Sequence, residues 1–241
     1  MFESALFVVA AAAGAVAAVV GFGIGSLLTP TLALQVGTRT AVAAVSLPHV
    51  IGTALRFWLV RSDVDRSVLW RFGLTSAAGG LAGALLSAAA SGRALATVFG
   101  ALLVFAGATQ ITGHAQRWRF KGGVAWIAGA ASGFFGGLVG NQGGIRSAAL
   151  LGFDVSKQRF VATATAIALV VDAARVPIYI ATEREPVIAI WRLVAVAIIG
   201  VVVGTLVGER LLSRVPERQF RRIVGAIILL LGAAILIRGR A

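Results

Sequence analysis

Two glycine-rich runs stand at matching places in the two halves of the sequence. The first is Gly21-Phe-Gly-Ile-Gly25, and the second, over 136–144, reads Gly-Gly-Leu-Val-Gly-Asn-Gln-Gly-Gly. A helix that begins after Gly25 or Gly144 presents unpaired backbone N–H groups and the positive end of its dipole. Glycine lets an anion approach these groups closely. We therefore predict an anion site at the two turns; the alternative is that the glycines only allow helices to pack tightly.

Polar side chains next to these glycines add to the predicted site. Ser26, Asn141 and Gln142 carry groups that hydrogen-bond an oxyanion, and Arg146 carries a full positive charge. We expect the anion to be surrounded by the backbone and side chains of six residues: Gly25, Ser26, Asn141, Gln142, Gly144 and Arg146.

Two arginines occupy equivalent positions inside apolar segments. Arg56 and Arg175 are 119 positions apart, and a charge inside a membrane is costly enough to suggest a function, here attracting or relaying the anion. Each lies only a few residues from the end of its segment, so the alternative is that its side chain snorkels to the membrane surface. Asp172 lies three residues before Arg175, on the same helical face, and is expected to pair with it.

His49 is the remaining candidate for contact with the substrate. It follows Pro48, which is expected to kink its helix. The imidazole is able to bind substrate or carry a proton, and a purely structural histidine is the alternative. With 2 histidines, no cysteine and one carboxylate well inside an apolar segment, the sequence offers no convincing catalytic set or metal site. We expect no enzyme activity, no metal and no cofactor.

The segments that position these residues are those of a membrane protein. Of 241 residues, 59% are hydrophobic and 13% are charged, whereas a soluble domain carries roughly a quarter charged residues. Apolar stretches such as 41–60, 69–90 and 187–208 approach or exceed the ~20 residues that cross a bilayer. The formal net charge of +13 lies mostly in short loops, where it contacts anionic lipid rather than nucleic acid. We predict an all-α polytopic membrane protein with a retained first segment.

The two halves of the chain resemble one another, and the polar stretch 113–123 divides them. We therefore expect a first transmembrane repeat over 1–112, a basic linker over 113–123 and a second repeat over 124–241. Eight residues recur at an offset of 119, among them Gly21 with Gly140 and Arg56 with Arg175. Towards the end of each half the offset becomes 125, as in Gly100 with Gly225 and Gly107 with Gly232.

Chain parity predicts that the halves are inverted. The apolar segment 24–36 covers only about 20 Å of a ~30 Å hydrocarbon core, so segments 4–20 and 24–36 form a hairpin, re-entrant or fully spanning. A hairpin returns the chain to the side it came from, so a hairpin plus three spans carries each half across the membrane an odd number of times. This scheme puts twelve Lys and Arg on one face and five on the other. A single broken span in place of each hairpin divides them almost evenly. Because cytoplasmic loops collect Lys and Arg, we expect the 113–123 linker in the cytoplasm and both termini outside.

Inverted repeats with broken helices are typical of secondary transporters whose site lies near the membrane midplane. With the cell interior negative, moving one negative charge outward gains ~2.3 kcal/mol per 100 mV. A small anion is therefore able to leave without a coupling ion, and coupling to protons or ions stays open.

The first glycine run and its surroundings resemble the sulfite exporter TauE/SafE family over essentially the whole chain. The first copy fits the family pattern at Gly21, Gly23, Gly25, Pro30 and Leu32. The second departs from it: Asn141 and Gln142 interrupt the glycines, Arg146 is inserted, and Ala149 stands where the family has proline. The resemblance implies an inner-membrane exporter of sulfite, organosulfonates or related anions.

Other functions remain open on the sequence alone. A transporter of another small anion or metabolite shares every feature but the substrate. A non-transporting membrane scaffold is the alternative of a different class. Besides the anion and membrane lipid, a second copy of the chain in a homodimer is a partner that the sequence leaves open.

Overall fold

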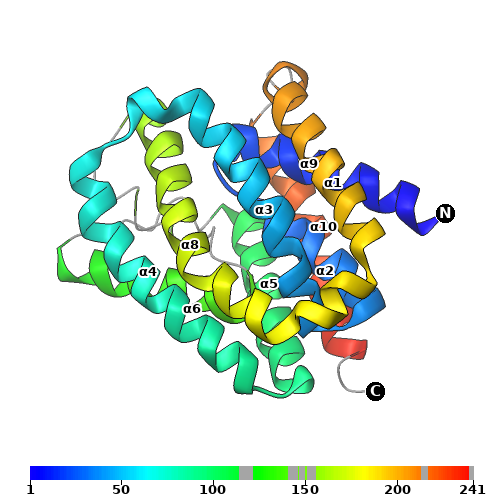
Figure 1. Ribbon diagram of the computed structural model, residues 1–241. Helices are drawn as coiled ribbons and strands as arrows, with labels where there is room; N and C mark the ends of the chain where they lie inside the picture. The colour runs from blue at the N-terminus through cyan, green and yellow to red at the C-terminus, as the bar shows by residue number, and fades with distance from the viewer. Residues whose placement is uncertain (114–121, 141–145, 147–149, 151–155, 213–216, 239–241) are drawn as a thin grey trace.

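The computed structural model describes residues 1–113, 122–140, 146, 150, 156–212 and 217–238. Every regular element within these residues is a helix (Figure 1), so the all-α prediction is confirmed. The helices are α1 (Phe2–Val20), α2 (Ile24–Val36), α3 (Thr38–Val60), the 3-10 helix η1 (Arg61–Asp63), α4 (Arg66–Ala89), α5 (Gly92–Thr112), α6 (Gly123–Val139), α8 (Lys157–Ala189), α9 (Trp191–Leu212) and α10 (Glu217–Arg238).

Within the described residues, six helices are long and apolar enough to cross a membrane: α1, α3, α4, α5, α8 and α9. The chain is therefore a multi-pass membrane protein. Helices α2 and α6 are apolar but shorter, with 13 and 17 residues. Most of α2 is buried among its neighbours, which is the condition under which a helix that stops at membrane depth is tolerated.

Left-handed glycines end α1 and α6 in the same way. Gly21 has φ 85° and its N–H donates to the carbonyl of Ala17 over 2.9 Å. Gly140 has φ 74° and donates to Gly136 over 3.0 Å. A side chain is strained at positive φ, so glycine closes both helices at the predicted places. The chain then reverses through Gly23, with φ 143°, into α2.

One predicted boundary is wrong. We expected separate apolar segments over 159–180 and 187–208. The helix is indeed interrupted between them, at Glu183, but residues up to Ala189 continue α8 beyond this kink, and α9 begins only at Trp191. Within α8 only Glu183 leaves helical geometry (φ −123°, ψ 20°). Pro186 follows three residues later and supplies no N–H to the preceding turn, so the helix bends there instead of ending.

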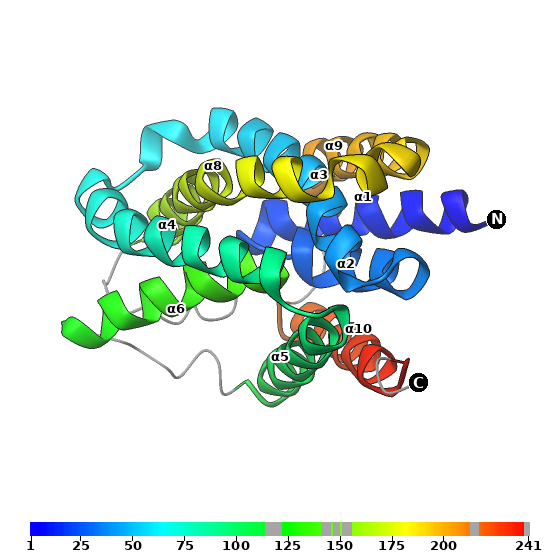
Figure 2. The ribbon, with the colours of Figure 1, turned by 60° about the horizontal axis from the view of Figure 1, so that its bottom comes forward.

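Close glycine contacts join α4 to α6 and α1 to α9, the two most extensive helix pairs (Figure 2). A methyl group on Gly79 in α4 would overlap the carbonyl oxygen of Ala130 in α6. Gly204 in α9 bears the same relation to Ala11 in α1. Gly204 lies 125 positions after Gly79 and Ala11 lies 119 before Ala130, so the two contacts are equivalent under the sequence offsets. Two further contacts repeat in this way: Gly83 with Phe134 as Gly208 with Ala15, and Gly133 with Ser76 as Gly14 with Val201.

Helices α5 and α10 pack against each other with reciprocal contacts. Gly100 lies against the carbonyl of Gly232, and Gly107 against that of Gly225. Residue numbers increase along α5 in the direction in which they decrease along α10, so the two helices are antiparallel. Equivalent residues exchange places across the contact, as they do about a two-fold axis.

The two broken helices enter the molecule from opposite sides. Both termini lie on one side, where α1 begins, whereas α6 begins on the other side, near the corner between α3 and α4 (Figures 1 and 2). The inverted arrangement of the two halves in a membrane stays a prediction.

Candidate functional site

A small cavity of about 20 Å³ lies at the first glycine turn. Of the nine residues predicted to bind substrate, it brings together Gly25, Ser26, His49, Arg56 and Arg146. Asn141, Gln142 and Gly144 lie outside the described residues. The remaining lining comes from the α1–α2 turn, α3, α8 and the end of α6: Ala17, Gly21, Phe22, Gly23, Ile24, Thr53, Gly140 and Ala168.

The two glycine turns touch each other at this cavity. A methyl group on Gly25, in the first turn of α2, would overlap the carbonyl oxygen of Gly140, which ends α6. The N-terminal end of α2 therefore faces the C-terminal end of α6. This close approach requires glycine at position 25. The same residue is therefore compatible with both alternatives, tight helix packing and an anion site at the turns.

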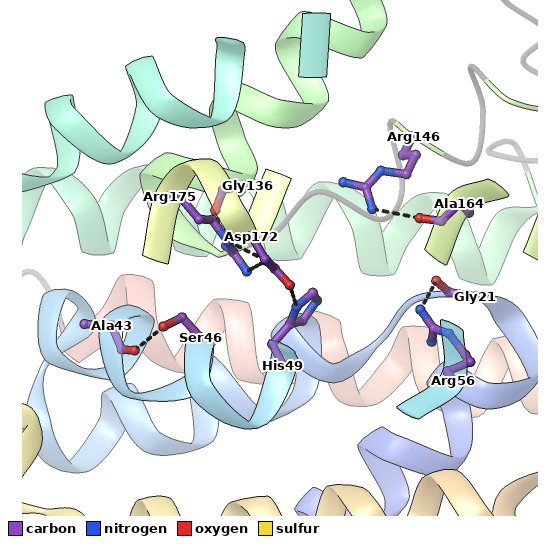
Figure 3. Close-up of polar contacts among 10 residues, drawn as sticks. All are labelled: Gly21, Ala43, Ser46, His49, Arg56, Gly136, Arg146, Ala164, Asp172 and Arg175. Carbon is purple, nitrogen blue, oxygen red and sulfur yellow. Dashed lines mark hydrogen bonds and ion pairs between the residues drawn. The ribbon is translucent and has the colours of Figure 1, made fainter. Parts of the chain in front are cut away.

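Arg56 is buried and fully engaged with protein oxygens. Its side chain is 5% exposed, which makes the snorkelling alternative wrong. Nη1 donates to the carbonyl of Ala17 over 2.6 Å, Nη2 to that of Gly21 over 3.2 Å, and Nε to the Thr165 hydroxyl over 2.8 Å. The last carbonyls of a helix carry the negative end of its dipole, and the Ala17 oxygen, which already accepts from Gly21 N–H, has a second lone pair for the arginine. The guanidinium thus caps α1 where the helix breaks (Figure 3).

Arg175 does the same for α6. It is 2% exposed, so snorkelling is wrong here too, and Nη1 donates to the carbonyl of Gly136. Gly136 stands 119 positions after Ala17, so the two arginines hold equivalent atoms. Nε and Nη2 contact Asp172 Oδ1 at 2.9 and 2.8 Å, which confirms the predicted pair. Arg175 is not among the residues that line the cavity.

A hydrogen bond that the sequence did not reveal joins His49 to Asp172. His49 Nδ1 lies 2.7 Å from Asp172 Oδ2, so α3 and α8 are linked by a chain from His49 through Asp172 to Arg175 (Figure 3). The internal repeat offered a clue to this contact. Under the offset of 119, Asp172 is equivalent to Thr53, which lies one helical turn after His49.

Arg146 brings a third buried guanidinium, 3% exposed, to the cavity wall. Its Nη1 lies 3.4 Å from the carbonyl of Ala164 in α8. Among the described residues around the cavity, Arg56, Arg146 and Arg175 outnumber the single carboxylate of Asp172. The local charge therefore favours an anion.

Tyr179 was also missed by the sequence analysis. It is buried and its hydroxyl donates to the carbonyl of Gly137, one residue from the Arg175 contact. It therefore helps to fix the end of α6.

The cavity is too small for an oxyanion in this conformation. About 20 Å³ accommodates roughly one water molecule. An anion of several heavy atoms enters only if the walls separate, and the Gly25–Gly140 contact is the place where the two turns meet.

A multi-pass helical bundle with a glycine-broken helix and a positively charged cavity inside it is an arrangement typical of membrane transport proteins. The family model of the sulfite exporter TauE/SafE matches residues 6–235, nearly the whole chain, and the chain belongs to this family. It is thus a membrane transporter of the sulfite and sulfonate type. No curated protein and no solved structure gave a match.

Proposed function

We propose that the protein exports a small sulfur-containing oxyanion, sulfite or an organosulfonate, across the cell inner membrane. The observation that carries the proposal is the cavity between the two glycine turns, lined by Arg56 and Arg146. Membership of the sulfite exporter family supports the substrate class.

The backbone and two side chains would hold the anion. The first N–H groups of α2, beginning at Ile24, point from a helix N-terminus and donate to anions well. Ser26 adds a hydroxyl and Arg146 a charge at the cavity wall. Arg56 already donates to three protein oxygens and holds the turn in place. Its contribution to anion binding would be the positive electrostatic potential at the cavity.

Alternating access would follow from the repeats. The close contacts α4–α6, α1–α9 and α5–α10 each join a helix of one half to a helix of the other, so the units that rock around the cavity would each contain helices of both halves. In this mechanism the halves are inverted, both termini lie outside and the 113–123 linker lies in the cytoplasm. The interior-negative potential then drives outward any anion that leaves with its charge uncompensated by a proton.

Flux from proteoliposomes tests the proposal. Vesicles holding the full chain are loaded with sulfite, methanesulfonate, sulfate or acetate, and efflux is followed with and without an imposed potential. We expect selective efflux of the sulfur anions that is accelerated by an exterior-positive potential. Arg146→Ala should abolish it, whereas Arg71→Ala, which removes an equal charge from an exposed site on α4, should not. Absence of flux together with absence of anion-induced thermal stabilisation would support a scaffold instead.

A further inference from the structure

We propose that His49 and Asp172 form a proton-binding site linked to the anion, so that His49 takes up one proton when the anion enters the cavity. The inference deepens the proposed function and rests on it, because it requires an anion at the cavity. It begins from the contact between His49 Nδ1 and Asp172 Oδ2 at 2.7 Å.

Asp172 is held in its ionised form by Arg175. Two donors of that guanidinium contact Oδ1 at 2.9 and 2.8 Å, and hydrogen bonds of this charge-assisted kind stabilise a carboxylate. The remaining oxygen, Oδ2, accepts from His49. Because a carboxylate is an acceptor only, His49 Nδ1 must carry the hydrogen, and the tautomer of the neutral ring is fixed.

The second ring nitrogen then has a lone pair while the ring is neutral. Among the residues that the structure describes, Nδ1 is the one nitrogen of His49 with a hydrogen-bond partner. The ring lines the cavity, and its side chain keeps 12% exposure. A neutral Nε2 presents an acceptor to an oxyanion and repels it, whereas a protonated Nε2 donates a hydrogen bond. Anion and proton therefore favour each other at this position.

The surrounding charges explain why His49 takes up the proton only when the anion binds. Burial of the ring, together with the charges of Arg175 on α8 and Arg56 on α3, disfavours a positive charge on His49, and Asp172 on α8 favours it. The other helices packed on α3 add little: α2 and α6 contain no titratable residue, and the charged residues of α5, η1 and α9 stand at helix ends. A bound anion offsets the arginines, so proton affinity rises on binding. By linkage, protonation raises anion affinity by the same factor.

Calorimetry on the purified full chain in lipid nanodiscs tests the proposal. Methanesulfonate and sulfite are each titrated in two buffers of different ionisation enthalpy, which gives the number of protons exchanged per anion. Methanesulfonate stays ionised throughout, so a proton taken up with it goes to the protein. We expect uptake approaching one proton at neutral pH, and an affinity that falls by up to about tenfold per pH unit as His49 loses its proton.

Two variants locate the proton. His49→Asn keeps an amide donor near the Nδ1 position and so preserves the bond to Asp172 without a titratable ring. It should bind anion with no proton uptake and with an affinity that does not change over this pH range. His114→Asn, at the other histidine of the chain, should keep the wild-type proton number.

The outcomes separate the two proposals. Anion binding without proton exchange in the wild type would overturn this inference and leave the proposed function standing. Proton uptake that persists in His49→Asn would overturn it as well, since the proton would then reside elsewhere. If neither anion binds, the proposed function fails first, and the linkage fails with it.

Discussion

Arg56 and Arg175 hold the ends of two different broken helices by equivalent atoms. Each is buried and donates through Nη1 to a carbonyl in the last turn of a helix, Ala17 in α1 and Gly136 in α6. The 119 positions between the arginines equal those between the two carbonyls. Because a guanidinium cannot lose its charge at ordinary pH, it serves as a permanent cap for a helix that ends inside the protein.

Removal of the two arginine caps should lower the free energy of unfolding by different amounts. Arg175→Gln leaves the buried carboxylate of Asp172 without its ion-pair partner, and breaking a buried pair from one side costs about 3–5 kcal/mol. Arg56→Gln leaves no carboxylate unpaired in direct contact and should cost less. Thermal unfolding in detergent measures both, with Arg71→Gln as the exposed control. The double change Asp172→Asn with Arg175→Gln should recover part of the loss; equal melting temperatures for the two single variants would contradict this assignment.

Gly25→Ala should slow anion efflux by more than the loss of folded protein explains. The added methyl group would overlap the Gly140 carbonyl oxygen and push the two glycine turns apart at the cavity. Overpacking of this kind costs about 1–3 kcal/mol. Gly92→Ala is the control, since nothing lies within 4 Å of a side chain there. Efflux rates normalised to folded protein check the prediction, and normal efflux from Gly25→Ala would show that the turns do not need this contact.

Equivalent glycines should respond alike to substitution. Gly79→Val and Gly204→Val each place a branched side chain against a backbone carbonyl, in α4–α6 and in α1–α9. Helix pairs joined through glycine lose this close approach when a larger residue replaces it. We expect both variants to lower the melting temperature by similar amounts. A large effect at one position and none at the other would argue against equivalent halves.

The membrane orientation is testable because the chain contains no cysteine. Single cysteines at Ser62 and Ser156 should be protected in intact cells from a membrane-impermeant thiol reagent, and cysteines at Ser4 and Ser91 should react. All four positions are exposed. The expected pattern follows from the inverted arrangement with both termini outside. Labelling of Ser62→Cys from outside would reverse the orientation, and identical behaviour at Ser4 and Ser62 would contradict the hairpin.

The sequence by itself determined the elements and the types of residue at the site. Apolar length is a local property, so nearly all helices and the left-handed glycines at 21 and 140 were predictable. The pair Asp172–Arg175 was predictable too, because three residues separate its members on one helix. The extension of α8 beyond the kink at Glu183 was not, since a polar stretch near Pro186 predicts a loop.

Only the tertiary structure decided what the charges contact. His49 and Asp172 are 123 positions apart, and their hydrogen bond depends on how α3 crosses α8. In the same way, Arg56 meets the end of α1 instead of the membrane surface, because the packed bundle brings the carbonyls of Ala17 and Gly21 within its reach. A sequence specifies which groups must find partners in an apolar environment, and the packing of distant helices selects those partners.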